Sequence, residues 1–401
     1  MIVNSTLVNE LFRGFYIQRW NDRIRPMDMT EMDKHAHKMI IAYIIGKYEE
    51  MRGNDIDWEK IIKSGIYELL RRIILSDIKS PIYSRLTKNQ KVFRKLNEYV
   101  FGELEAKIES EIINKELEEY LFDESMLFHK SLETDDINIK ILNAAHIYAS
   151  FWEFQIIKNS NPNSYQNIRI ETELLNKINN YQDLDGVQKL TNMHTIANFI
   201  DLIGQLRFQT RWAQTPRIPR TSVLGHVLLV ACISYFFSRE NESCPKRLYN
   251  NFFGGLFHDL PEAATRDIIS PLKRTSHEFE EMLKQIEEEL TEEEILPMLE
   301  PEWRDEMRYF TIDEFDNKVI VENNLLKKGI TVDVINENYN NDIFNPYDGE
   351  IIRTADQLAA FLEAYNSINS GVKTRELLRA AQGIKENYKR KTIGKVPIRK
   401  L

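Results

Sequence analysis

The chain has few cysteines and lacks an apolar run long enough to cross a membrane. Its 401 residues contain two cysteines, Cys232 and Cys244, which do not form a CxxC pair. This excludes a zinc ribbon or a disulfide framework and favours a reducing compartment. The longest apolar stretch, 227–237, is too short for a bilayer, and the N-terminus lacks a signal-peptide pattern. We therefore expect a cytoplasmic protein without a membrane partner.

An excess of positive charge is also lacking. The formal net charge of −9 argues against a surface that binds a nucleic acid polymer, because phosphates require clustered Lys and Arg. The length allows two domains of ordinary size. Most of the chain has helical periodicity, with loops such as 159–164 and 336–348 and one expected β-pairing of 319–321 with 329–332. The sequence therefore predicts an all-α protein made of two helical bundles.

The motif with the clearest chemistry is a His–Asp pair, His258-Asp259. Its two side chains can reach one divalent metal from a single helical turn, and imidazole and carboxylate suit Mn, Co, Fe, Ni or Zn. His226 lies upstream in an apolar segment, where a lone His is more often a core residue. Asp356 lies downstream in another apolar segment, where an unpaired carboxylate would be costly to bury. Together these four residues are the predicted ligands of one divalent transition metal ion.

In this order the residues resemble the HD-domain metal-dependent phosphohydrolases, in particular the bacterial 5′-deoxyribonucleotidase branch, over roughly the second half of the chain. Further positions match that branch: Arg211-Trp212 before the first His, then Glu262, Asp267 and Pro271-Leu272-Lys273 after the His–Asp pair. The chain departs from it at Gly225 and Val227, where the family often has Glu and Ser around the first His. This departure affects the substrate assignment more than the metal.

The resemblance implies hydrolysis of a small nucleotide, most simply a 5′-monophosphate. It implies that Glu262 assists proton transfer, that Arg211 and Lys273 bind phosphate, and that Trp212 packs on the sugar. Asp267 is grouped with Glu262 as catalytic, although the presence of Asp77 at the same position in the first half favours capping, turn formation or orientation of the site over direct catalysis. Taken alone, Glu262 could be an exposed helical residue and Trp212 a core aromatic. Two other functions stay open: hydrolysis of nucleoside triphosphates or signalling nucleotides, and a non-catalytic nucleotide sensor.

The first half of the chain repeats the pattern in altered form. Residues 65–82 align without gaps on 255–272, and 141–153 resembles the segment around Asp356. Arg19-Trp20 corresponds to Arg211-Trp212, and His37 falls opposite His226. The residues opposite His258, Asp259, Glu262 and Asp356 are Glu68, Leu69, Arg72 and His146.

A leucine cannot bind a metal and an arginine cannot accept a proton, so the first site should be inactive. We expect a tandem duplication, with a degenerate HD-like domain at 1–160 and an intact domain at 161–401. The alternative is a chance similarity of apolar periodicity. Because the resemblance implies that single-copy relatives pair as homodimers, it also implies an intrachain pseudo-dimer, with a homo-oligomer possible in addition.

Overall fold

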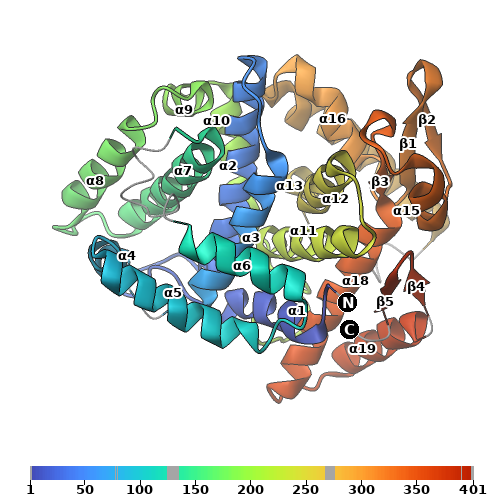
Figure 1. The fold of residues 1–401 in the computed structure, drawn as a ribbon, viewed down its shortest axis with the longest axis horizontal. Coiled ribbons are helices and arrows are strands. Elements are labelled where there is room, and N and C mark those ends of the chain that lie inside the picture. Colours follow the sequence, from blue (N-terminus) through green and yellow to red (C-terminus); the bar gives the residue numbers. More distant parts are fainter. Residues whose placement is uncertain are drawn as a thin grey trace. The chain divides into compact units, whose positions relative to one another are not determined.

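The computed structural model describes residues 2–76, 78, 80–123, 135–266, 276–389 and 391–398, without the side chains of 80, 81 and 84. Contacts divide the chain into two compact units, residues 1–192 and 193–401, and each is described by itself (Figure 1). Both units are built mainly of helices, which confirms the all-α prediction.

In the first unit the central helix is α2 (Glu31–Met51), which is buried along nearly its whole length. It begins at a capping box, in which the Thr30 hydroxyl accepts from the Asp33 backbone N–H and the Asp33 carboxylate accepts from the Thr30 backbone N–H. The other elements of this unit are α1 (Ser5–Phe12), η1 (Arg13–Tyr16), α3 (Trp58–Ile74), α4 (Ser80–Leu86), α5 (Gln90–Glu105), α6 (Glu111–Phe122), α7 (Ile137–Ser160), α8 (Asn167–Asn179) and α9 (Asp185–Thr191). The expected domain boundary after residue 160 falls at the end of α7, whereas the first compact unit extends to residue 192. The two following helices, α8 and α9, pack on α7 and α2 within the first unit.

In the second unit the central helix is α11 (Val223–Glu240), which packs against α12 (Pro245–Phe257) and α18 (Gly349–Asn369). The apolar stretch 227–237 was expected to be too short for a bilayer, but the whole helix α11 is long and apolar enough to cross one by length and composition. It is 89% buried inside the structure, as is usual for a core helix. The remaining helical elements are α10 (Thr195–Gly204), η4 (Gln205–Phe208), α13 (Glu262–Thr265), α15 (His277–Leu290), η5 (Thr291–Ile295), η6 (Leu296–Met298), α16 (Pro301–Thr311), η7 (Glu322–Asn324), α17 (Val332–Val334), η8 (Ile335–Tyr339), η9 (Asp342–Phe344) and α19 (Arg375–Tyr388).

A small sheet in the second unit has the strand order β2-β1-β3. Its strands are β1 (Asn317–Val321), β2 (Leu325–Lys328) and β3 (Tyr347–Asp348), and β4 (Thr392–Ile393) pairs separately with β5 (Val396–Pro397). The expected partner of 319–321 was wrong, because β1 pairs with 325–328 and not with 329–332. Gly329, at φ +72°, ends β2, and the Thr331 side chain then accepts from the Val334 N–H to cap α17.

A buried ion pair fixes the start of α18 against α12. Both side chains, Arg247 of α12 and Asp348 before α18, are fully buried. The guanidinium donates from Nε to Oδ2 at 2.6 Å and from Nη2 to Oδ1 at 2.8 Å, and Asn251 Nδ2 donates to the same Oδ2 at 2.7 Å. This bidentate pair defines the position from which α18 runs past α11.

We predict that Asp348→Ala lowers the free energy of unfolding by about 3–5 kcal/mol, because a buried guanidinium is left without its carboxylate. Asp305→Ala is the control: Asp305 is 95% exposed and pairs with Arg308 on the surface, so its loss should change the free energy by about 0.5 kcal/mol or less. Urea titrations followed by far-UV circular dichroism measure both. Equal effects of the two substitutions would contradict the role of the pair.

Candidate metal centre

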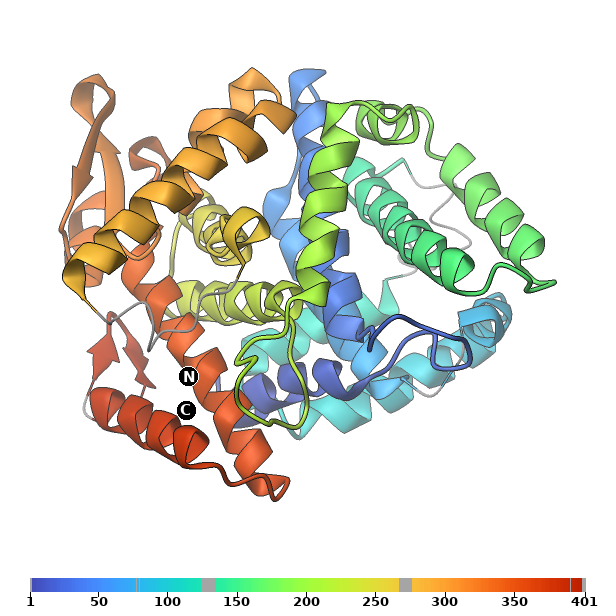
Figure 2. The same cartoon turned by 180° about the vertical axis from the view of Figure 1, so that it is seen from behind.

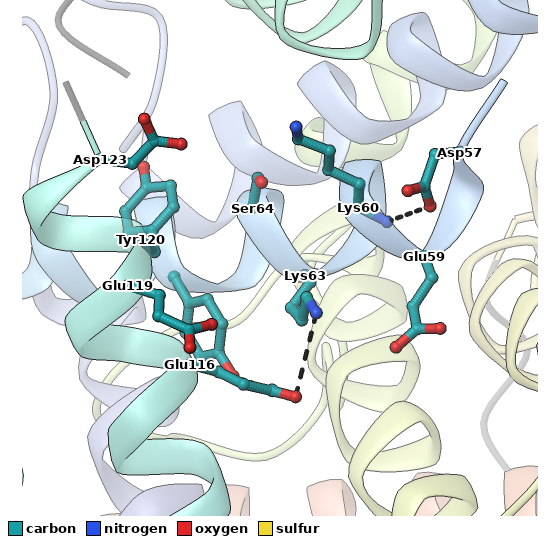
Figure 3. Close-up of a pocket in the computed structure, with 10 residues that line it drawn as sticks. Asp57, Glu59, Lys60, Lys63, Ser64, Glu116, Glu119, Tyr120 and Asp123 are labelled. Carbon is teal, nitrogen blue, oxygen red and sulfur yellow. Dashed lines mark hydrogen bonds and ion pairs between the residues drawn. The ribbon is translucent and has the colours of Figure 1, made fainter. Parts of the chain in front are cut away.

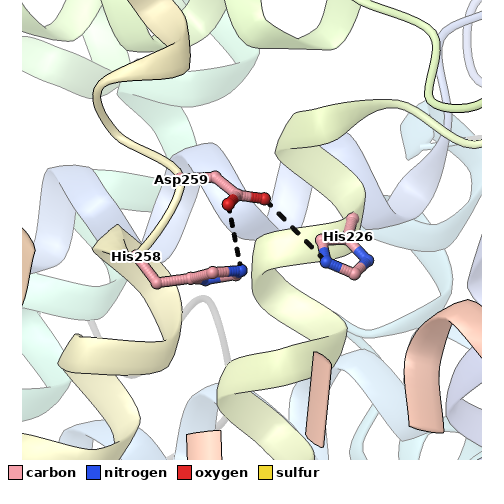
Figure 4. A group of neighbouring side chains, drawn as sticks. All are labelled: His226, His258 and Asp259. Carbon is pink, nitrogen blue, oxygen red and sulfur yellow. Dashed lines mark ion pairs between the residues drawn. The ribbon is translucent and has the colours of Figure 1, made fainter. Parts of the chain in front are cut away.

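Three helices bring the predicted metal ligands together. His226 lies in the first turn of α11, His258 follows the last residue of α12, and Asp356 lies in the middle of α18. One ligand atom each from His226, His258 and Asp259 lies within 4.8 Å of the other two, and their side chains point toward one another (Figure 4). Asp356 Oδ1 lies 2.9 Å from His226 Nε2. All four predicted ligands therefore converge on one place.

The tautomer of His258 follows from its hydrogen bond. Its Nδ1 lies 2.9 Å from the carbonyl oxygen of Gly255, which can only accept, so Nδ1 carries the proton in the neutral ring. The other nitrogen, Nε2, is buried and has no hydrogen-bond partner among the described residues, although Asp259 Oδ1 lies 3.2 Å away. A backbone carbonyl behind Nδ1 and a free lone pair on Nε2 are typical of a metal-binding histidine.

The charges at the site favour a bound cation. Asp259 and Asp356 bring two carboxylates beside the two imidazoles, and Arg211 contributes one positive charge. Its Nη1 lies 3.5 Å from Asp259 Oδ2 and its Nη2 lies 3.8 Å from Asp356 Oδ1. Burial opposes ionisation of Asp356, but the hydrogen bond with His226 and the charge of Arg211 hold the pKa of this carboxyl below its usual value. The donor set of two imidazoles and two carboxylates fits a divalent transition metal ion.

Glu363, which the sequence analysis did not select, organises the surroundings of this centre. Its carboxylate is fully buried and accepts from Trp212 Nε1 at 2.8 Å and from Thr221 Oγ1 at 2.6 Å. Arg211 Nε lies 3.4 Å from the same carboxylate. Burial alone would raise the pKa of Glu363, but the charges of Arg211 and Arg217 lower it to about 2. The loop that carries Arg211 and Trp212 is thereby attached to α18 (Figure 2).

A sequence signal for Glu363 existed. It follows Asp356 by seven residues, two helical turns, and therefore lies on the same face of α18. In the aligned first half Glu153 is its identical counterpart.

The other predicted site residues divide into two groups. Glu262 is the first residue of α13 and is only 7% exposed, so it is not an ordinary surface residue. Trp212 is half-buried, with the Arg217 guanidinium 5.7 Å from its ring centre. Asp267 and Lys273 lie outside the described residues.

A separate cleft of about 310 Å³ lies in the first unit beside α3 and α6 (Figure 3). Acidic side chains are prominent in its lining, together with Lys60 and Lys63, and Lys63 Nζ lies 3.9 Å from Glu116 Oε1. None of the predicted site residues that the structure describes lines this cleft. It is therefore distinct from the candidate metal centre.

Comparison with known proteins gives one result for this part of the chain. The family model of the HD domain matches residues 203–385, a range that contains His226, His258, Asp259 and Asp356. Neither the curated proteins nor the solved structures gave a match to the chain. HD domains bind divalent metals, in agreement with the donor set assembled by α11, α12 and α18. This match supports assignment of the second unit to the HD-domain superfamily.

Proposed function

We propose that the HD domain removes phosphate from a small nucleotide in the manner of a 5′-nucleotidase, with one divalent transition metal ion. The observation that carries this proposal is the convergence of His226, His258, Asp259 and Asp356 beside the partly buried Arg211. These four residues would hold the ion. When bound, it supplies a Lewis acid for a phosphoryl oxygen and lowers the pKa of a water molecule.

Arg211 is suited to bind the phosphate. Its Nε faces Glu363, whereas Nη1 and Nη2 face the carboxylates of the centre. Because Glu363 holds one edge of the planar guanidinium, the other edge is oriented toward the place where a phosphate would lie. Arginine donors in this arrangement match phosphoryl oxygens and stabilise charge that builds up during hydrolysis.

Glu262 and Trp212 complete the proposed site. The Glu262 N–H donates to the Asp259 carbonyl at 3.1 Å, so Glu262 begins the turn that directly follows the His–Asp pair. We assign to its carboxylate the transfer of a proton to or from the reacting oxygens. The indole of Trp212 is fixed through Nε1 to Glu363, which leaves its ring to pack on the sugar. Asp267 and Lys273 keep their predicted catalytic and phosphate-binding roles as proposals.

We also propose that the first unit is a degenerate copy of the HD domain. In each unit a short 3-10 turn leads into a loop that an isolated β-bridge closes, Gln18 with Thr30 and Thr210 with Ser222. The bridge residue Thr30 or Ser222 then caps the central helix. These two loops correspond at a constant offset of 192 residues.

The Arg–Trp pair in the loop is held alike in both units. Trp20 has φ 54° and Trp212 has φ 55°. Trp20 Nε1 donates to Glu153 Oε2 at 3.0 Å, and Arg19 binds the same carboxylate at 2.9 Å. Trp212 and Arg211 make the corresponding contacts with Glu363. Two unrelated helical bundles would not be expected to repeat these details, so they support the duplication.

The experiment that tests the proposed activity is a screen of deoxyribo- and ribonucleoside mono- and triphosphates with Mn, Co, Ni, Fe or Zn. We expect metal-dependent release of inorganic phosphate, fastest from a 5′-monophosphate. Tight nucleotide binding without phosphate release under all conditions would contradict an enzyme and favour a sensor.

We predict that His258→Ala removes the bound ion while the helical content stays the same, because the substitution deletes a ligand at the end of α12. His277→Ala is the matched control, since the side chain of His277 is 81% exposed. Elemental analysis of the purified full chain, together with circular dichroism, measures both quantities. A stoichiometric ion retained in the His258 variant would refute the ligand set.

We predict that Glu262→Gln lowers kcat by a factor of about a hundred to ten thousand, the range of general acid–base groups, without loss of metal. Glu302→Gln is the control, because Glu302 is also in the first turn of a helix but is exposed. Steady-state kinetics and metal content decide the outcome. An unchanged kcat would show that Glu262 has no part in proton transfer.

A further inference from the structure

The correspondence between the two units identifies the residues of the first unit that occupy the ligand positions. The offset of 192 set by Arg19 and Arg211 places Lys34, and not His37, opposite His226. The His37 ring instead packs edge-on against Trp152, with ring centres 4.9 Å apart.

Two further ligand positions are fixed independently of this offset. The pairing of Glu153 with Glu363 places His146 opposite Asp356, and the ungapped alignment keeps Glu68 opposite His258.

The side chains of Lys34, Glu68 and His146 converge in the first unit as the proposed metal ligands do in the second. Lys34 Nζ lies 2.7 Å from His146 Nδ1. In the second unit the corresponding residues are His226 and Asp356, and His226 Nε2 lies 2.9 Å from Asp356 Oδ1. His146 Nδ1 lies in turn 3.0 Å from Glu68 Oε1. The place of the centre is therefore preserved although its ligands have changed.

The exposure of corresponding residues to solvent is also similar in the two units. The side chain of His146 is 30% exposed and that of Asp356 is 26% exposed. Lys34 is 1% exposed, as deeply buried as His226, which is fully buried. The first unit thus has an amine where the second has an imidazole at the same depth.

The surrounding charges have changed together with the ligands. A second buried lysine, Lys38, forms an ion pair with Glu68, and its counterpart at the same offset is the apolar Val230. Arg72 stands at the position of Glu262 and lies 3.4 Å from Glu31, whose counterpart is Val223. Leu69 replaces the ligand Asp259 and removes one carboxylate. The added charges of Lys38 and Arg72 thus each meet a carboxylate, Glu68 or Glu31, that has no acidic counterpart in the second unit.

We propose that in the first unit the ammonium groups of Lys34 and Lys38 take the place of the metal ion and make this centre metal-independent. These two groups contact the Glu68 carboxylate and the His146 ring as a metal ion would. Unlike a metal ion, they are part of the chain and cannot dissociate. Burial and the nearby charge of Arg19 disfavour the ammonium form of Lys34 and lower its pKa to about 7, whereas the carboxylates of Glu31 and Glu68 favour that form. The inference rests on the metal centre proposed for the second unit but not on the reaction at that centre.

Reversion of the two lysines to the residues of the second unit tests this proposal. The full chain with His258→Ala provides a background without bound metal. In that background Lys34→His with Lys38→Val places an imidazole beside Glu68 and His146, and two imidazoles with one carboxylate suit Mn, Fe, Co, Ni or Zn. We expect the metal content to rise from none to about one ion per chain. A control with Lys115→His, at a side chain that is 76% exposed, should stay without metal.

A folded reverted chain that binds no metal would overturn the proposal, as would a wild-type chain that binds two ions. Because this experiment measures metal content and not activity, its result can be interpreted even if the nucleotidase assay fails. A His258→Ala chain that retained metal would instead count against the ligand set of the second unit.

Hydrogen exchange of the unreverted chain gives a second measurement if the reverted chain does not fold. Removal of metal by a chelator should accelerate exchange in α11, α12 and α18 but not in α2, α3 and α7, because the lysines cannot be extracted. Lys34→Met should accelerate exchange in α2 and α7, whereas Lys115→Met should not. Chelator-induced exchange in both sets of helices would overturn the proposal.

Discussion

The carboxylate of Glu363 is the constraint on which the site in the second unit depends. A carboxylate without access to water is strongly destabilising unless hydrogen bonds and positive charge surround it. Here the partners are Trp212, Thr221 and Arg211, all supplied by the loop that precedes α11. The loop conformation, the orientation of the guanidinium and the edge of the metal centre formed by α18 are therefore set by the same buried group.

Supporting hydrogen bonds hold the residues that we propose as metal ligands. His226 is placed by the first turn of α11, which Ser222 caps through the Gly225 N–H. The tautomer of His258 is set by Gly255, and α18 is fixed at its start by the pair of Arg247 and Asp348. A centre that is held by its supporting hydrogen bonds in this way loses little conformational freedom when it binds an ion.

Much of this could be predicted from the sequence, because the predicted ligands are local signals. His258-Asp259 are adjacent, and His226 and Asp356 stand out as polar residues in apolar helices. Glu363 was missed because a glutamate in a helix is usually exposed; its spacing from Asp356 places it on the same helix face, but only the folded loop reveals its partners. Similarity of residue type favoured His37 as the counterpart of His226, whereas the two β-bridges support the proposed pairing of Lys34 with His226. The partner of β1 is 325–328 and not the predicted 329–332. Although 329–332 is apolar in character, Gly329 forms a turn and Thr331 caps α17.

The two indoles bound to buried carboxylates have a spectroscopic consequence. Trp20 and Trp212 are two of five tryptophans in the chain, and each donates Nε1–H to a charged group that also binds an arginine of its site. The emission of an indole responds to the field of a neighbouring charge. An event that moves Arg211 relative to Glu363 therefore alters the light emitted by Trp212, while Trp20 reports on Arg19 and Glu153. Because Trp58, Trp152 and Trp303 also emit, the signal of Trp20 or Trp212 is obtained as the difference between the emission of the unchanged chain and that of the chain in which this one tryptophan is replaced with phenylalanine.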